Sequence, residues 1–261
     1  MKILYFLYYT LNSRKSKGVF LSFFIFCVFA CAVLLPFALQ RGKDSLLPRR
    51  EYYLLCFYEG KDATSAKQAA DALSLRGGAG KICEEGGGYS VYACAYENSK
   101  DAESVRKRIK DAGGSCKIKV FVLPSLSARK TEGENQAVLL AEECFSICFS
   151  AFTKAYKDAE NGKERALICA ELSLVREKVS TLKKAVGKSE KAVEKVAGKN
   201  QKTAKESSVF STVRAFVSEC ERGVEELLLE STRSALSIGA KRAQLSLLLS
   251  YRALLSSFLH K

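Results

Sequence analysis

The chain has 261 residues, a formal net charge of +14 and 48% hydrophobic residues, and its one histidine is His260. This length allows one or two domains, and the apolar share fits a globular protein that also carries one strongly apolar insertion. A lone histidine beside the terminus excludes a Cys-His or Ser-His catalytic pair in the core.

The apolar insertion is residues 19–39, VFLSFFIFCVFACAVLLPFAL, an uncharged run of about the twenty residues that cross a bilayer. Arg14 and Lys15 are among the basic residues that precede it, which favours a cytoplasmic N-terminus. We therefore predict a cytoplasmic tail over 1–18, a single transmembrane helix over 19–39, and a linker over 40–50. The rest of the chain is then outside the cell membrane.

Two alternatives for this segment are cleaved signals. Ala30-Cys31-Ala32 matches the small-x-small pattern of a signal peptidase site, and Cys31 fits a lipoprotein signal. The uncleaved anchor is favoured because the sequence stays apolar through Leu39. Outside the membrane the basic charge points to anionic lipid heads or wall polymers, and nucleic acid is not expected as a partner.

The next part of the chain contains a repeat. Residues 52–78 and 89–114 both open with Tyr, carry a Cys two residues before a Tyr-Glu pair, pass through Lys-Asp-Ala and close on Gly-Gly. Such a sequence repeat indicates that one small supersecondary unit occurs twice. The patterns predict strands at 52–58, 79–85, 89–96 and 116–123, with helices between the first pair and the last pair. The result is a βαββαβ domain over 51–124, with both helices on one face of an antiparallel sheet.

Strand alternation predicts which residues lie on the other face of this sheet. They are Tyr52, Leu54, Cys56, Tyr58, Ser90, Tyr92, Cys94 and Tyr96, with Lys117, Lys119 and Phe121 from the last strand. An open aromatic sheet is typical of a recognition surface. In the alternative, the C-terminal helices cover this face. RNA-recognition domains share the element order, but their basic-Gly-aromatic motif is absent from this sequence.

The repeat resembles SPOR domains, the peptidoglycan-binding modules of bacterial division and sporulation proteins. Residues 89–96, YSVYACAY, are similar to that family's Tyr-x-Val-x-Val-Gly-x-Phe line, and residues 52–75 are similar to its first half. Cys94 stands where the family has glycine, and Cys56 is its counterpart in the first half. The resemblance covers about 52–123 and implies a ferredoxin-like fold on a single-pass anchor in a bacterial cell membrane.

The resemblance also implies a binding site for peptidoglycan glycan strands on the sheet face. The residues expected to form it are Tyr52, Leu54, Tyr58, Tyr92, Tyr96, Lys117 and Lys119. In a ferredoxin-like order the first and third strands are neighbours, which makes Cys56 and Cys94 a candidate disulfide.

After a linker over 125–133, residues 134–261 show apolar positions that alternate spacings of three and four in three segments, as in an antiparallel helical bundle. Asn161-Gly162 predicts the first turn, and the lysine-rich stretch 183–205 includes the second. The third helix is expected over 206–260, with a break at Gly223 or Gly239. The bundle could bind a partner helix or form a homo-oligomer.

Catalytic and metal-binding patterns are weak in this sequence. Cys144 and Cys148 are one helical turn apart and could hold a metal, but with no histidine or further cysteine nearby we expect them to be core residues. Neither a metal nor a cofactor is expected, and the protein is not expected to be an enzyme. The lysines of 183–205 are interpreted as the solvated end of a helical hairpin, with an acidic polymer or lipid as the alternative ligand.

The sequence therefore predicts a noncatalytic, membrane-anchored envelope protein with two candidate functions. In the first, the SPOR-like domain binds peptidoglycan glycan strands during division or sporulation. In the second, the protein is a membrane-tethered scaffold whose α/β domain and bundle bind protein partners. An open sheet face would favour the first function, and a covered face would favour the second.

Overall fold

The structure is a computed structural model that describes residues 45–128, 131–197 and 203–259. The chain divides into two units, Met1–Leu46 and Leu47–Lys261, and the fold below belongs to the second.

The predicted cytoplasmic tail and transmembrane helix lie outside the described residues. The end of the predicted linker over 40–50 is described: β1 (Ser45–Leu47) is a strand, and Arg50 already belongs to β2. Likewise, the predicted linker over 125–133 contains β6 (Leu126–Ser127) and the start of α5. β1 and β6 form a small two-stranded sheet.

The α/β half has the predicted βαββαβ order. Its elements are β2 (Arg50–Gly60), α3 (Ala63–Leu75), β3 (Lys81–Glu85), β4 (Gly88–Tyr96), α4 (Ser99–Asp111) and β5 (Lys117–Leu123). The strands form one antiparallel sheet in the order β3-β4-β2-β5. Each helix begins at a side-chain cap: the Asp62 carboxylate accepts from the Ser65 amide at 2.6 Å, and Asn98 Oδ1 accepts from the Lys100 amide at 2.8 Å.

The repeated Gly-Gly pairs end α3 and α4 in the same way. Gly77 and Gly113 have φ values of +84° and +78°, in the left-handed region that favours glycine. The amides of the second glycines then donate back to the helix, Gly78 to Leu73 at 3.0 Å and Gly114 to Ile109 at 2.8 Å. A Cβ on either second glycine would lie under 3 Å from the same Leu73 or Ile109 side chain. The repeated Gly-Gly pairs therefore reflect one helix-ending geometry, which occurs at the ends of both α3 and α4.

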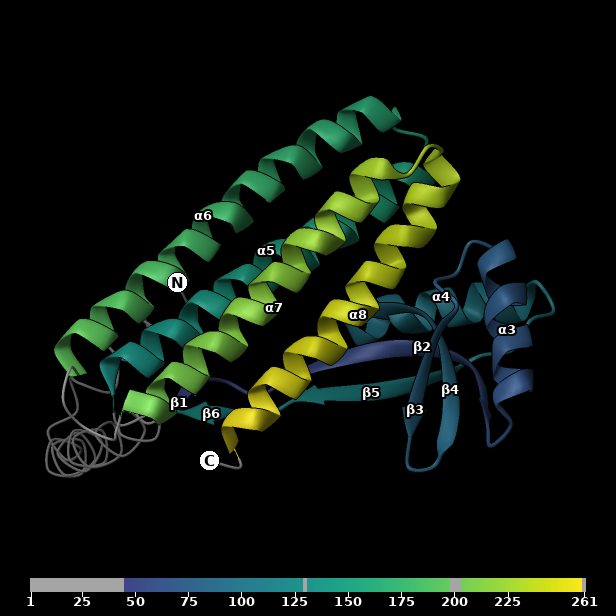
Figure 1. Ribbon diagram of the computed structural model, residues 1–261. Coiled ribbons are helices and arrows are strands. Elements are labelled where there is room, and N and C mark those ends of the chain that lie inside the picture. The colour runs from purple at the N-terminus through teal and green to yellow at the C-terminus, as the bar shows by residue number, and fades with distance from the viewer. Residues whose placement is uncertain (1–44, 129–130, 198–202, 260–261) are drawn as a thin grey trace, which may run out of the picture. The chain divides into compact units, whose positions relative to one another are not determined.

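The C-terminal half is a bundle of four helices. They are α5 (Glu132–Glu160), α6 (Arg165–Ala197), α7 (Thr203–Leu229) and α8 (Arg233–Leu259), and they lie side by side in Figure 1. The first turn is at Asn161-Gly162 as predicted, and Gly162 has a φ of +86°. Most of the lysine-rich stretch 183–205 belongs to α6, and the connection to α7 lies outside the described residues.

The predicted third helix over 206–260 does break, but between α7 and α8 at residues 230–232 instead of at Gly223 or Gly239. The Arg165 guanidinium donates to the carbonyls of Leu228 and Glu230, which closes the end of α7. Thr232 Oγ1 then accepts from the Ala235 amide at 3.1 Å and begins α8. Gly223 and Gly239 lie inside helices.

Helix α5 forms much of the core between the two halves. Among the described residues it is the one helix long and apolar enough to cross a membrane by length and composition, with 44% of its most apolar window buried. Its apolar side chains contact the sheet on one side and α8 on the other. The Tyr52 ring of β2 lies 6.1 Å from Phe145 and 4.9 Å from Phe149, and Phe145 stacks on Tyr251 of α8 at 4.2 Å.

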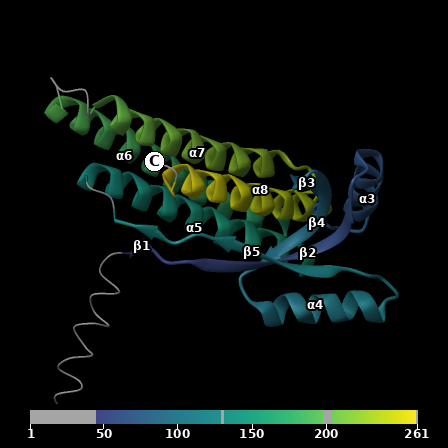
Figure 2. The same cartoon turned by 90° about the horizontal axis from the view of Figure 1, so that it is seen from below.

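The sheet is therefore a middle layer. Helices α3 and α4 pack against its strands, and Figure 2 shows α4 on the side of the sheet opposite α5 and α8. Arg50 of β2 and Tyr251 of α8 both bind Glu142 of α5, which adds a polar link to the aromatic contacts.

Replacing Phe145 with alanine should reduce the free energy of unfolding by about 3–5 kcal/mol, because it removes a buried ring from the contact between sheet and bundle. Urea unfolding followed by circular dichroism would measure this. The matched control is Leu174→Ala at a side chain that is 60% exposed, where a change within about 0.5 kcal/mol is expected. Equal effects of the two variants would show that the halves do not share a core.

Candidate functional site

The predicted recognition face of the sheet is covered by the bundle. Tyr52, Leu54 and Tyr92 are only 3%, 2% and 2% exposed, and Cys56 and Phe121 are also buried. Tyr52 lies against the α5 aromatic rings, and burial raises its pKa to about 12. The prediction of an open aromatic face was wrong, because the bundle uses the same apolar side chains as its own packing surface.

Tyr58 and Tyr96 do not lie on this face. Two register shifts interrupt the pairing of β2 with β4, on either side of Cys56. Beyond them Tyr58 lies opposite Val91, and Tyr96 lies opposite Tyr53. Directly opposite residues have their side chains on the same face of a sheet, so Tyr58 shares a face with Val91 and Tyr96 shares one with Tyr53. Simple alternation had placed Val91 and Tyr53 toward α3 and α4. The irregular pairing explains why the period of two assigned these tyrosines to the wrong side.

Lys117 and Lys119 both pair with Glu59. Lys119 pairs with Glu59 at 2.5 Å, donates to Ser90 Oγ at 3.0 Å and lies 5.8 Å from the centre of the Tyr92 ring. Lys117, whose side chain is 77% exposed, is 3.3 Å from Glu59. The bonds from Lys119 and Lys117 lower the pKa of Glu59. These lysines therefore hold the sheet edge, and the single carboxylate offsets one of their two charges.

The candidate disulfide is not formed. Cys56 and Cys94 are both buried free thiols, and Cys56 lies opposite Tyr92 in the strand register. Burial raises the pKa of each thiol. Cys94 instead approaches Gln244 of α8, whose Oε1 also accepts from the Ala95 amide at 3.3 Å. Gln244 is fully buried and its Nε2 donates to Thr153 Oγ1 of α5 at 2.7 Å, so one side chain joins three elements.

A cavity of about 660 Å³ lies beside Ala93, Cys94 and Tyr96 of β4. Both Gly-Gly turns line it, together with apolar side chains from the sheet, α3 and α4. Lys241 at its wall donates to the Gly77 carbonyl at 2.6 Å and pairs with Glu160. The buried Tyr156 hydroxyl has no hydrogen-bond partner among the described residues. Arg76 and Arg108 also line the cavity, so its wall has polar as well as apolar groups.

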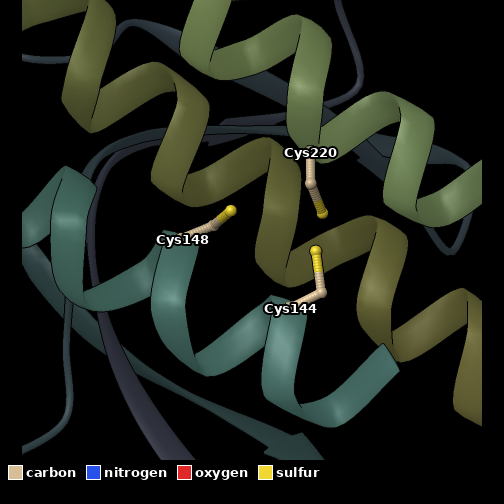
Figure 3. Close-up of side chains that lie close together, drawn as sticks. All are labelled: Cys144, Cys148 and Cys220. Atoms are coloured by element: carbon tan, nitrogen blue, oxygen red, sulfur yellow. The ribbon is translucent and has the colours of Figure 1, made fainter. Parts of the chain in front are cut away.

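The bundle core contains the most distinctive chemical group of the structure. Cys144 and Cys148 of α5 and Cys220 of α7 are fully buried, and their Sγ atoms lie within 4.8 Å of one another. Figure 3 shows the sulfurs of Cys144 and Cys220 pointing toward each other, with Cys148 directed at the same space. The one-turn spacing on α5 is visible in the sequence, but Cys220 was not predicted to join it, because it is 72 positions beyond Cys148 in the chain.

Comparisons of the chain with protein-family models, curated proteins and solved structures give no match. The SPOR resemblance stays a prediction that depends on the residues quoted for it.

Replacing Gln244 with leucine should reduce the free energy of unfolding by about 1–3 kcal/mol, because the buried Ala95 amide loses the acceptor Oε1 and Thr153 Oγ1 loses the donor Nε2. Chemical unfolding would measure it, with Gln68→Leu at an exposed position of α3 as the matched control. A Gln244 variant as stable as the control would show that this side chain does not join the sheet to the bundle.

Proposed function

We propose that this chain is a noncatalytic, membrane-anchored scaffold that binds a protein partner through the outer face of its helical bundle. The anchor is the apolar segment 19–39, and the α/β half has a ferredoxin-like topology, an assignment that the strand order β3-β4-β2-β5 supports. The single observation that carries the scaffold proposal is the burial of the sheet face under α5 and α8.

Glycan binding on this sheet would require aromatic rings that a sugar can reach. Tyr52 and Tyr92 are almost completely buried, and the nearby lysines are paired with Glu59. Opening the face would separate Tyr52 from Phe149 and remove the acceptor that Gln244 offers to Ala95. A wall polymer would have to compete with a packed core, so the scaffold is favoured over the glycan-binding module.

The partner surface that we propose lies on α6. Leu167 and Leu174 are 52% and 60% exposed and lie seven residues apart, so they share one face of the helix. Helix α6 packs mainly against α5 and α7 and forms an outer side of the bundle in Figure 1. Exposed leucines at heptad spacing are typical of a surface that receives another helix.

Charge supports one kind of partner. Among the α6 side chains that the structure describes, the exposed basic ones outnumber the exposed acidic one, Glu177. Lys178 and Lys188 are four and fourteen residues beyond Leu174, so they share its face of the helix. A second copy of the chain docked on this face would bring like charges together. We therefore propose an amphipathic helix with acidic flanks as the partner.

The first test is sedimentation of residues 45–261 with purified cell-wall sacculi and with glycan strands stripped of their stem peptides. The protein is expected to stay in the supernatant with both materials, because the sheet face is covered. The exposed Lys117 should not matter, so a Lys117→Ala variant should behave identically. Pelleting that prefers stripped glycan would contradict the scaffold proposal and restore the glycan-binding function.

The second test places a photo-crosslinking amino acid at Leu174 in the cells that make the protein. A crosslinked product is expected there but not from the same probe at Leu139, an α5 side chain that is 46% exposed. The added charge of Leu167→Glu should reduce the product to background, because it repels an acidic partner. The matched control Leu75→Glu, on the 91% exposed leucine of α3, should leave it unchanged. A product that contains two copies of this chain would contradict the acidic partner.

A further inference from the structure

The three buried thiols have the geometry of a ligand set. Cys144 and Cys148 are one turn apart on α5, and the aromatic contacts of Phe145 and Phe149 hold that turn against the sheet. Cys220 reaches the same point from α7. A metal bound by three thiolates at about 2.3 Å would place the sulfurs about 4 Å apart. The observed limit of 4.8 Å requires only a small contraction.

We propose that Cys144, Cys148 and Cys220 form a buried binding site for a single Cu(I) ion. Thiolates select soft metals, among which Cu(I) and Zn(II) are the biological candidates. Structural zinc is almost always bound by four ligands. No fourth histidine, cysteine or carboxylate belongs to this cluster within the part of the chain that the structure describes. A set of three sulfurs therefore suits Cu(I) better than zinc.

A cavity gives the ion a route to the site. Cys220 is on the wall of a cavity of about 370 Å³ between α7 and α8. Three acidic residues (Glu219, Glu226 and Glu230) and three basic ones (Lys81, Arg222 and Arg242) are on the same wall, so the opening is polar and carries both signs of charge. Gly223, one turn beyond Glu219, has no side chain to fill the space next to Phe152. The cluster is thus buried but lies directly behind an opening in the bundle.

Cu(I) binding displaces the protons of the three thiols to solvent as the Cu–S bonds form, and no electron is transferred.

The test uses the full chain, purified under reducing conditions in detergent and titrated with Cu(I) against a coloured Cu(I) chelator. One equivalent should be withheld from the chelator by the wild type. In the variant with Cys144, Cys148 and Cys220 all changed to alanine, the apparent affinity should fall at least about 100-fold. The matched control changes Cys83, Cys116 and Cys169 to alanine and should bind as the wild type does. A parallel zinc titration is expected to show weaker binding.

Two further readouts do not depend on the cluster variant folding normally. X-ray absorption of the control variant with one equivalent of Cu(I) should show three sulfur neighbours at about 2.3 Å. The thermal midpoint of the same variant should rise with Cu(I), because the preformed site binds the ion more tightly than the unfolded chain does. The absence of binding, equal binding by the two triple variants, or nitrogen and oxygen neighbours would overturn the proposal. Zinc retained in place of Cu(I) would overturn the choice of metal.

Discussion

The packing of one aromatic row between sheet and bundle determines most of this structure. Tyr52 of β2 contacts Phe145 and Phe149 of α5, and Phe145 stacks on Tyr251 of α8. Burying large rings is among the strongest stabilising contributions in a protein core. The same contact fixes the rotation of α5, whose neighbouring residues Cys144 and Cys148 point toward α7. Closing the sheet face and assembling the thiol cluster are therefore two results of one interaction.

Polar links at this contact specify how the two halves fit. Gln244 binds the sheet and α5 together, and Glu142 binds Arg50 of the sheet and Tyr251 of α8. Buried polar groups are costly unless they are satisfied, so only one alignment of sheet and bundle provides all these partners. The sheet and the bundle are therefore held together as one unit, in which the sheet face does not open. The partner surface that we propose is on an outer helix for this reason.

The two proposals concern separate parts of the bundle. The docking surface depends on exposed leucines and basic charge on α6, while the metal site depends on buried thiols of α5 and α7. A thiolate-bound ion would tie α7 to α5 and stiffen the bundle on which α6 is carried. Either proposal can fail without the other, since neither uses a side chain of the other.

The sequence by itself determined the local structure, because helix periodicity, caps and Gly-Gly turns act over a few residues. It predicted the βαββαβ order, the turn at Asn161-Gly162 and a helical bundle. It could not show the register shifts around Cys56, which moved Tyr58 and Tyr96 to the other face of the sheet. Nor could it show the break at Glu230, because that break depends on Arg165 from α6. Only the tertiary structure decided that the sheet is covered and that Cys220 joins Cys144 and Cys148. Contacts between residues that are distant in the chain leave no periodic signal, since an apolar side chain looks the same in sequence whether it faces solvent, a ligand or another helix.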